Sequence, residues 1–177
     1  MLSIVNPAGF SRALRTRDAV GTLLAHMGIE SQWELEIAAM LSQIGSVVLP
    51  PAVVERHYYG KTLTHSDTVA VHGMAKVASR LVDGIPRMDG VARILMDQDR
   101  RFDGKGAPAD RPHGTDLPWG ARILKVLLDL DILETRGLPP ESAMEMVRSR
   151  TGWYDPEIVE LVAEMRDAFD SPDAPVL

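Results

Sequence analysis

Residues 102–108 read Phe-Asp-Gly-Lys-Gly-Ala-Pro, and residues 117–124 read Leu-Pro-Trp-Gly-Ala-Arg-Ile-Leu. The first stretch lies in a segment, residues 100–118, that is rich in Gly, Pro and Asp and shows no helical period, which predicts a loop. Loops of this length inside a compact domain tend to carry function. Pro118 is placed to open a helix, and residues 119–133 are apolar on nearly every side, which predicts a central, buried helix.

The remainder of the chain predicts further helices and no sheet. Apolar residues recur at intervals of three and four, and strict alternation is rare, so we expect an all-α bundle. The expected helices cover residues 11–27, 34–43, 52–58, 64–82, 88–99, 141–150 and 156–169. The fold class is therefore a helical bundle with one long Gly- and Pro-rich loop between its fifth and sixth helices.

The composition limits the classes of protein to which the chain can belong. A chain of 177 residues suits one domain, which we expect over residues 1–170, with a frayed tail at 171–177. The chain has no Cys, which excludes thiolate metal sites, and no apolar run long enough for a membrane span. No basic and apolar leader opens the chain, so we expect a cytoplasmic protein.

Charge argues against a nucleic-acid partner. The formal net charge is −6, and acidic and basic residues are interspersed, whereas a nucleic-acid footprint needs a clustered basic face. Three arginines, Arg12, Arg15 and Arg17, form a short basic run on the first expected helix. We expect them on a solvated helix face.

The loop and the helix after it resemble those of HD-GYP phosphodiesterases, in which the loop reads His-His-Glu-Arg-aromatic-Asp-Gly-x-Gly-Tyr-Pro. Residues 38–50, Ala-Ala-Met-Leu-Ser-Gln-Ile-Gly-Ser-Val-Val-Leu-Pro, are similar to the frame around the family's Leu-His-Asp-Ile-Gly-Lys. Residues 152–159 are similar to the family's Gly-x-x-Phe-Asp-Pro-x-Leu-Val ending. The resemblance runs from about residue 8 to residue 165. It implies an HD-domain bundle with a five-helix core and flanking C-terminal helices.

The resemblance also implies that most metal ligands of the family are replaced. In the family, His and Asp side chains from several helices bind divalent metals that activate water. The matching positions in this chain are Phe10, Ser42, Gln43, His72, Gln98, Asp99 and Leu128. Only His72 keeps a family ligand, and Ser, Gln and Leu are poor metal ligands. We therefore expect no bound metal and no cofactor.

The loop offers a second candidate site, for a phosphate group or a protein partner. Its residues are Arg101, Asp103, Gly104, Lys105, Gly106 and Pro108, together with Arg122 on the following helix. We expect Asp103 to accept backbone N–H groups and hold the glycine turn. The basic residues either contact phosphate or have structural roles. Ala107 replaces the Tyr through which the family loop is tied to substrate and partner recognition.

Taken with the resemblance, these replacements predict a signal-transduction domain that is not an enzyme. We expect it to act through a protein partner in bacterial cyclic-dinucleotide or two-component signalling. The partner would be a GGDEF-type cyclase domain, a receiver domain or a second copy of the chain. One alternative is a binder of cyclic di-GMP or another nucleotide without hydrolysis. The other is a phosphodiesterase with a rebuilt metal site, formed by His72 with Asp97, Asp99 or Asp131.

Overall fold

The structure is a computed structural model that describes residues 6–106 and 112–170. Pro108 and the predicted tail at residues 171–177 lie outside these ranges. The helices are α2 (Pro7–His26), α3 (Trp33–Leu41), α4 (Pro51–Tyr58), α5 (His65–His72), α6 (Met74–Val82), α7 (Asp89–Asp97), α8 (Trp119–Thr135), α9 (Pro140–Ser149) and α10 (Pro156–Asp170). Two 3₁₀ turns, Ile44–Val48 and Gly114–Asp116, complete the order. Within the described ranges there is no strand, which confirms the all-α prediction.

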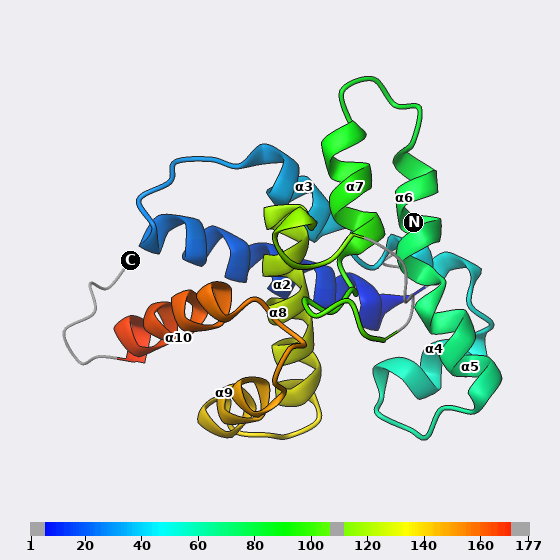
Figure 1. Ribbon diagram of the computed structural model, residues 1–177. Helices are drawn as coiled ribbons and strands as arrows, with labels where there is room; N and C mark the ends of the chain where they lie inside the picture. The colour runs from blue at the N-terminus through cyan, green and yellow to red at the C-terminus, as the bar shows by residue number, and fades with distance from the viewer. Residues whose placement is uncertain (1–5, 107–111, 171–177) are drawn as a thin grey trace.

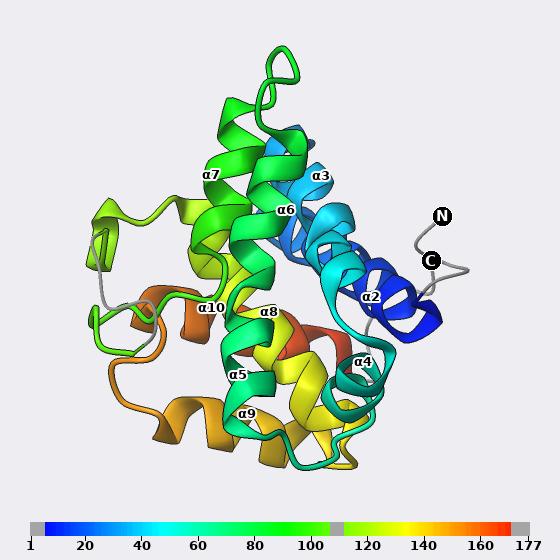
Figure 2. The same ribbon diagram turned by 90° about the vertical axis from the view of Figure 1, so that its right-hand side faces the viewer.

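Helix α8 runs through the middle of the bundle (Figure 1). It contacts α2, α3, α7, α9 and α10. Helices α6 and α7 form an antiparallel pair that stands beside α3, and α9 lies at the other end of the molecule (Figure 2). Helix α10 contacts α2, α8 and α9. The side chains of Ile123, Leu124 and Val126 are completely buried. The prediction of a central helix in this segment is therefore confirmed.

The main apolar core joins residues of α2, α3, α6, α7, α8, α9 and α10. A smaller apolar cluster joins Leu49, Val53 of α4 and Met74 of α6. None of the helices in the described part of the chain has the length and hydropathy that a membrane span requires.

Three helix boundaries differ from the prediction in ways that shape the site. Helix α3 ends at Leu41 and α7 at Asp97, so the residues just beyond them belong to turns rather than helices. The helix predicted over 64–82 divides at Gly73 into α5 and α6. Gly is a poor helix former, and here it ends one helix and begins the next. The start of α5 is set by Thr64, whose side chain and that of Asp67 form a capping box.

Gly45 allows the turn after α3 to lie directly against α6. A Cβ atom at this position would stand 2.1 Å from the carbonyl oxygen of Met74. Only a residue without a side chain permits such an approach of two backbones. The close contact fixes the segment that carries Ser42 and Gln43 next to the junction of α5 and α6.

Candidate functional site

A pocket of about 190 Å³ gathers six of the seven positions that the resemblance assigns to metal ligands. They come from the end of α3, the end of α5, the end of α7 and the middle of α8. The lining residues are Arg12, Ser42, Gln43, His57, Val71, His72, Met74, Gln98, Asp99, Lys125, Leu128, Asp129 and Ile132. Positions far apart in the sequence therefore share one concave site.

Phe10 is the position that does not reach this pocket. Its side chain is 39% exposed on the surface of α2. Arg12 lines the pocket instead and is only 6% exposed. The expectation of a solvated helix face is therefore wrong for Arg12, because a residue two positions along a helix points about 200° away from Phe10.

Neutral amide and hydroxyl groups occupy one wall of the pocket. The Gln98 side-chain amide donates to the carbonyl oxygen of Ser42 at 2.9 Å. The Gln43 amide donates to Ser42 Oγ at 3.3 Å, and Gln43 Oε1 accepts from the Tyr58 hydroxyl at 2.8 Å. Gln98 Oε1 is buried and has no hydrogen-bond partner within the described residues. Most polar groups of this wall thus form hydrogen bonds with other groups of the protein.

Arg12 brings a buried positive charge into the pocket. Its guanidinium donates to the carbonyl oxygen of Leu128 at 2.8 Å, and its Nε lies 3.3 Å from Asp131 Oδ2. Burial lowers the pKa of Arg12, and the Asp131 carboxylate offsets part of this effect. A guanidinium nevertheless stays charged in proteins. A protein cation therefore lies beside Leu128, the position at which the resemblance places a ligating Asp.

Lys125 adds a second positive charge on α8. Its ammonium lies 2.8 Å from Asp129 Oδ2, one helical turn away, and the residue is 9% exposed. The Tyr154 hydroxyl donates to the same carboxylate oxygen at 2.8 Å. The Lys125 ammonium also lies 5.6 Å from the ring centre of Trp153, within cation–π range. One oxygen of the Asp129 carboxylate, Oδ2, thus accepts from two groups of the protein.

His72 and Asp99 are the remaining family positions that carry a donor atom. His72 is exposed at the edge of the pocket, and Asp99 is partly buried in it. Burial raises the pKa of Asp99, an effect that the Lys125 ammonium opposes and the Asp129 carboxylate reinforces. In the rebuilt metal site considered above, His72 would bind a metal together with Asp97, Asp99 or Asp131. Asp97 instead pairs with Arg100, and Asp131 pairs with Arg12 and Arg15.

The donor set does not fit a family-type metal cluster. Across residues 6–106 and 112–170, no group of three or more His, Cys, Asp or Glu side chains is placed to hold a metal ion. In the pocket, neutral Gln and Ser and apolar Leu128 stand at positions where ligands are expected. Lys125 of the pocket pairs with Asp129, and Arg12 pairs with Asp131 beside the pocket. A divalent cation would meet weak donors and like charge here.

The loop at residues 100–106 is built on Asp103. Asp103 Oδ1 accepts the N–H of Lys105 at 2.9 Å, and Gly104 and Gly106 take positive φ angles of 71° and 110°. Both Asp103 oxygens also accept from Arg101, at 3.1 and 2.6 Å. The Arg101 guanidinium lies 4.7 Å from the centre of the Trp153 ring. Arg101 is therefore occupied in holding the loop against the segment before α10.

The other predicted phosphate contacts differ in their surroundings. Arg122 forms an ion pair with Asp155, which is 3% exposed. Lys105 is exposed, and the described residues supply no ion-pair partner for its ammonium. Of the three basic residues proposed for phosphate, only Lys105 lacks an ion pair with another residue in the described ranges.

Four titratable residues that line the pocket were not predicted from the sequence, namely Arg12, His57, Lys125 and Asp129. Lys125 could have been found from its place inside a helix that is apolar nearly all round, since a lone charge there must be buried and paired. Asp129, one turn along, is its natural partner. For Arg12 and His57 the sequence offers no such signal, because their surroundings come from distant segments.

His57 predicts a pH dependence of stability. Burial lowers the pKa of His57 to about 4, and Arg12 and Arg136 add to this effect. Between pH 4 and about 6.5 the unfolded chain binds a proton that the folded chain does not, so stability falls as pH falls through this range. The loss should be on the order of 3 kcal/mol. Urea titrations of the wild type and His57→Gln at several pH values would measure it.

The His57→Gln variant should show a flatter stability profile between pH 6.5 and 4 than the wild type. Carboxylates that titrate in the same range contribute equally to both proteins and cancel in the difference. Parallel profiles for the two proteins would show that His57 is protonated as easily in the folded state as in the unfolded chain.

The chain belongs to the HD domain family, whose sequence pattern matches residues 1–158. Among solved structures it is similar to Bd1817, a HDG"Y"P protein from Bdellovibrio bacteriovorus, with 14% identity and a TM-score of 0.73 over 90% of this chain and 52% of that one. It is also similar to V-cGAP3, a cyclic GMP-AMP specific phosphodiesterase in V. cholerae, with 16% identity and a TM-score of 0.65 over 97% of this chain and 50% of that one. No curated protein matches the sequence.

These likenesses confirm an HD-GYP-like HD domain and an all-α HD bundle. At such low identity the two solved structures establish the fold alone. The chain spans about half the length of each of them.

Proposed function

We propose that this HD domain is a non-catalytic signalling module that acts through a protein partner. Its fold is that of a phosphohydrolase family, and a structural neighbour is a cyclic GMP-AMP phosphodiesterase, which supports a role in cyclic-dinucleotide or two-component signalling. The partner would be a GGDEF-type domain, a receiver domain or a second copy of the chain. Fold alone does not establish function, so the proposal rests on the chemistry of the pocket.

The observation that carries this proposal is the charge inside the pocket. Arg12 and Lys125 contribute two positive charges, and Asp99 and Asp129 contribute two negative ones when ionised. His57 is neutral at pH 7, because burial and the nearby arginines lower its pKa to about 4. The pocket therefore holds no surplus negative charge to attract divalent cations, and the neutral donors do not replace it.

Hydrolysis of a phosphodiester by an HD domain depends on metal ions, which lower the pKa of bound water and neutralise phosphate charge. Here Lys125 pairs with Asp129 and Arg12 pairs with Asp131, and neither cation can make a hydroxide from water at neutral pH. The pocket therefore supports a domain that keeps the frame of the family's site without its reaction.

A second candidate is a nucleotide binder without hydrolysis. It is favoured by the cations around Trp153, because Arg101, Arg150 and Lys125 lie 4.7, 5.0 and 5.6 Å from its ring centre. Aromatic and guanidinium groups together suit a nucleobase and its phosphate. The ion pairs of Arg101 with Asp103 and of Arg122 with Asp155 weigh against it. Saturable binding of cyclic di-GMP in the presence of a chelator would favour this second function.

Hydrolysis assays test the main proposal directly. We expect no turnover of cyclic di-GMP or cyclic GMP-AMP above the buffer rate with Mn²⁺ or Fe²⁺, and no change in His72→Ala. The double variant Ser42→His and Gln43→Asp should stay inactive as well, because Gln98, Leu128 and the Arg12 guanidinium remain in the pocket. Metal-dependent turnover by the wild type that His72→Ala abolishes would contradict the proposal.

A further inference from the structure

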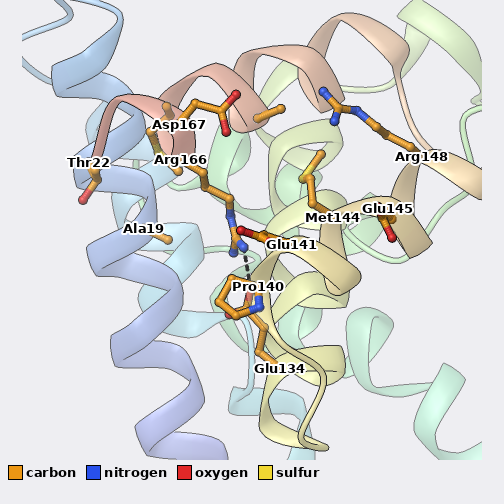
Figure 3. A pocket seen from close by; sticks show the side chains of 12 residues that line it. Ala19, Thr22, Glu134, Pro140, Glu141, Met144, Glu145, Arg148, Arg166 and Asp167 are labelled. Atoms are coloured by element: carbon orange, nitrogen blue, oxygen red, sulfur yellow. Dashed lines mark hydrogen bonds and ion pairs between the residues drawn. The ribbon is translucent and has the colours of Figure 1, made fainter. Parts of the chain in front are cut away.

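A hollow of about 640 Å³ lies between α2, α8, α9 and α10 (Figure 3). Both arginines that line it are paired within the protein. Arg148 lies 2.8 Å from Glu160, and Arg166 pairs with Glu134, as the dashed line in Figure 3 marks. Neither of these arginines is left for an external anion.

A smaller pocket, of about 110 Å³, lies where α2, α4 and the end of α8 meet. Arg12 and Arg15 of α2, His57 of α4, and Asp131 and Arg136 from the end of α8 are among the residues that line it. We call it the arginine pocket. Its volume is well below the range of about 300–1,000 Å³ that is typical of sites for larger ligands, so it suits one small group.

Arg12 has an unsatisfied donor beside the arginine pocket. Its side chain is 7% exposed, and it donates a hydrogen bond to Leu128 through Nη2. Its buried Nε has no hydrogen-bond partner among the described residues, although it lies 3.3 Å from Asp131 Oδ2. Buried N–H groups are rarely left without an acceptor, so this atom points to an acceptor that comes from outside the chain.

The charges that line the arginine pocket are not balanced. Among the described residues of its lining only Asp131 is acidic, and both of its oxygens accept from Arg15, at 2.6 and 3.1 Å. Arg136 is exposed and has no ion-pair partner in the described ranges. The lining therefore carries a surplus of two positive charges, or of one when Arg12 is counted with the first pocket, which it also lines.

His57 is subject to the same positive field. Burial lowers the pKa of His57 to about 4, and Arg12 and Arg136 contribute to this shift. The two guanidinium groups thus act on the pocket as cations whose charge is not cancelled locally. The neutral His57 ring offers a hydrogen bond and adds no charge at pH 7.

We infer that the arginine pocket binds a phosphate group, either as inorganic phosphate or as the monoester of a small molecule. A phosphate monoester carries about −1.5 to −2 charge at pH 7, which matches the surplus, and guanidinium groups suit its oxygens. Because Arg136 is exposed and the Arg15 side chain is 49% exposed, the rest of an ester would extend into solvent. This inference does not depend on the proposed function, since it requires neither a protein partner nor hydrolysis.

An NMR titration of the full ¹⁵N-labelled chain tests the inference. Inorganic phosphate is added at a constant ionic strength of about 0.15 M, so that screening stays fixed, and the Nε–H signals of Arg12 and Arg15 are followed. Adenosine 5′-monophosphate and adenosine form a second arm, which distinguishes a monoester from free phosphate. The variant Arg136→Gln removes a cation at an exposed position of the pocket, and Arg80→Gln makes the same change at an exposed position of α6 outside it.

We expect saturable shifts of both arginine signals, with affinity about fivefold weaker in Arg136→Gln and changed by about twofold or less in Arg80→Gln. Tighter binding of the nucleotide than of phosphate, with no binding of adenosine, would assign the pocket to a monoester, and the reverse order would assign it to free phosphate. No saturation by either phosphate compound up to about 20 mM, unmoved Arg12 and Arg15 signals, or equal weakening by the two variants would each overturn the inference.

Discussion

Replacing Arg12 by alanine is expected to lower the free energy of unfolding by about 2–3 kcal/mol. The guanidinium is buried, donates to the Leu128 carbonyl oxygen at 2.8 Å and lies 3.3 Å from Asp131. Its removal takes away the side-chain donor to the Leu128 carbonyl oxygen and opens a cavity beside the pocket. Asp131 keeps its two hydrogen bonds from Arg15, so the loss comes from the cavity and from the lost side-chain donor, not from an unpaired carboxylate. Chemical denaturation monitored by circular dichroism would measure the loss.

Arg15→Ala is a matched control for this variant. Arg15 pairs with the same carboxylate, with its Nε 2.6 Å from Asp131 Oδ1, but its side chain is 49% exposed. Exposed ion pairs contribute about 1 kcal/mol or less, so this variant should lose correspondingly little stability. Similar losses in the two variants would contradict the role given to the buried guanidinium.

Replacing Asp155 by alanine should lower the free energy of unfolding by about 4 kcal/mol. Asp155 is 3% exposed and has two functions. One oxygen accepts from the Arg122 guanidinium of α8, and the other accepts the N–H of Glu157 at 3.0 Å in the first turn of α10. Alanine removes the helix cap and leaves the largely buried Arg122 charge unpaired. Thermal and urea denaturation of the variant would measure the effect.

Asp155→Asn separates these two contributions. Asparagine is a good helix cap but carries no charge, so we expect an intermediate loss of about 2 kcal/mol. If Asp155→Ala lowered the free energy of unfolding by about 1 kcal/mol or less, the link between α8 and α10 would contribute little to stability.

The sequence predicted the elements whose signal is local. The helix over 119–133 was predictable because its apolar residues occur on every side, which only a buried position explains. The division at Gly73 was not predicted, because an isolated Gly is tolerated in many helices and the preference is decided by packing. The start of α2 at Pro7, with the Asn6 side chain accepting from Gly9, extends the helix beyond its predicted start at residue 11.

The sequence predicted where the candidate site lies better than it predicted which charged residues line it. The frame around Gly45 and the loop at 102–106 placed Ser42, Gln43, Gln98 and Leu128 at one site, and these residues line one pocket. Arg12 was missed because an arginine on an amphipathic helix is usually solvated. Arg12 is buried only because Asp131 and the Leu128 carbonyl, distant in sequence, lie opposite it.

The most direct test of the central claim, that protein cations have replaced metal ions in this pocket, is the metal content of the purified chain. The protein would be dialysed against buffer with iron, manganese or zinc, freed of excess metal and analysed by mass spectrometry. The pocket chemistry predicts well below one metal ion per chain, with no difference between wild type and His72→Ala. One or more tightly held metal ions per chain, lost in His72→Ala, would contradict it.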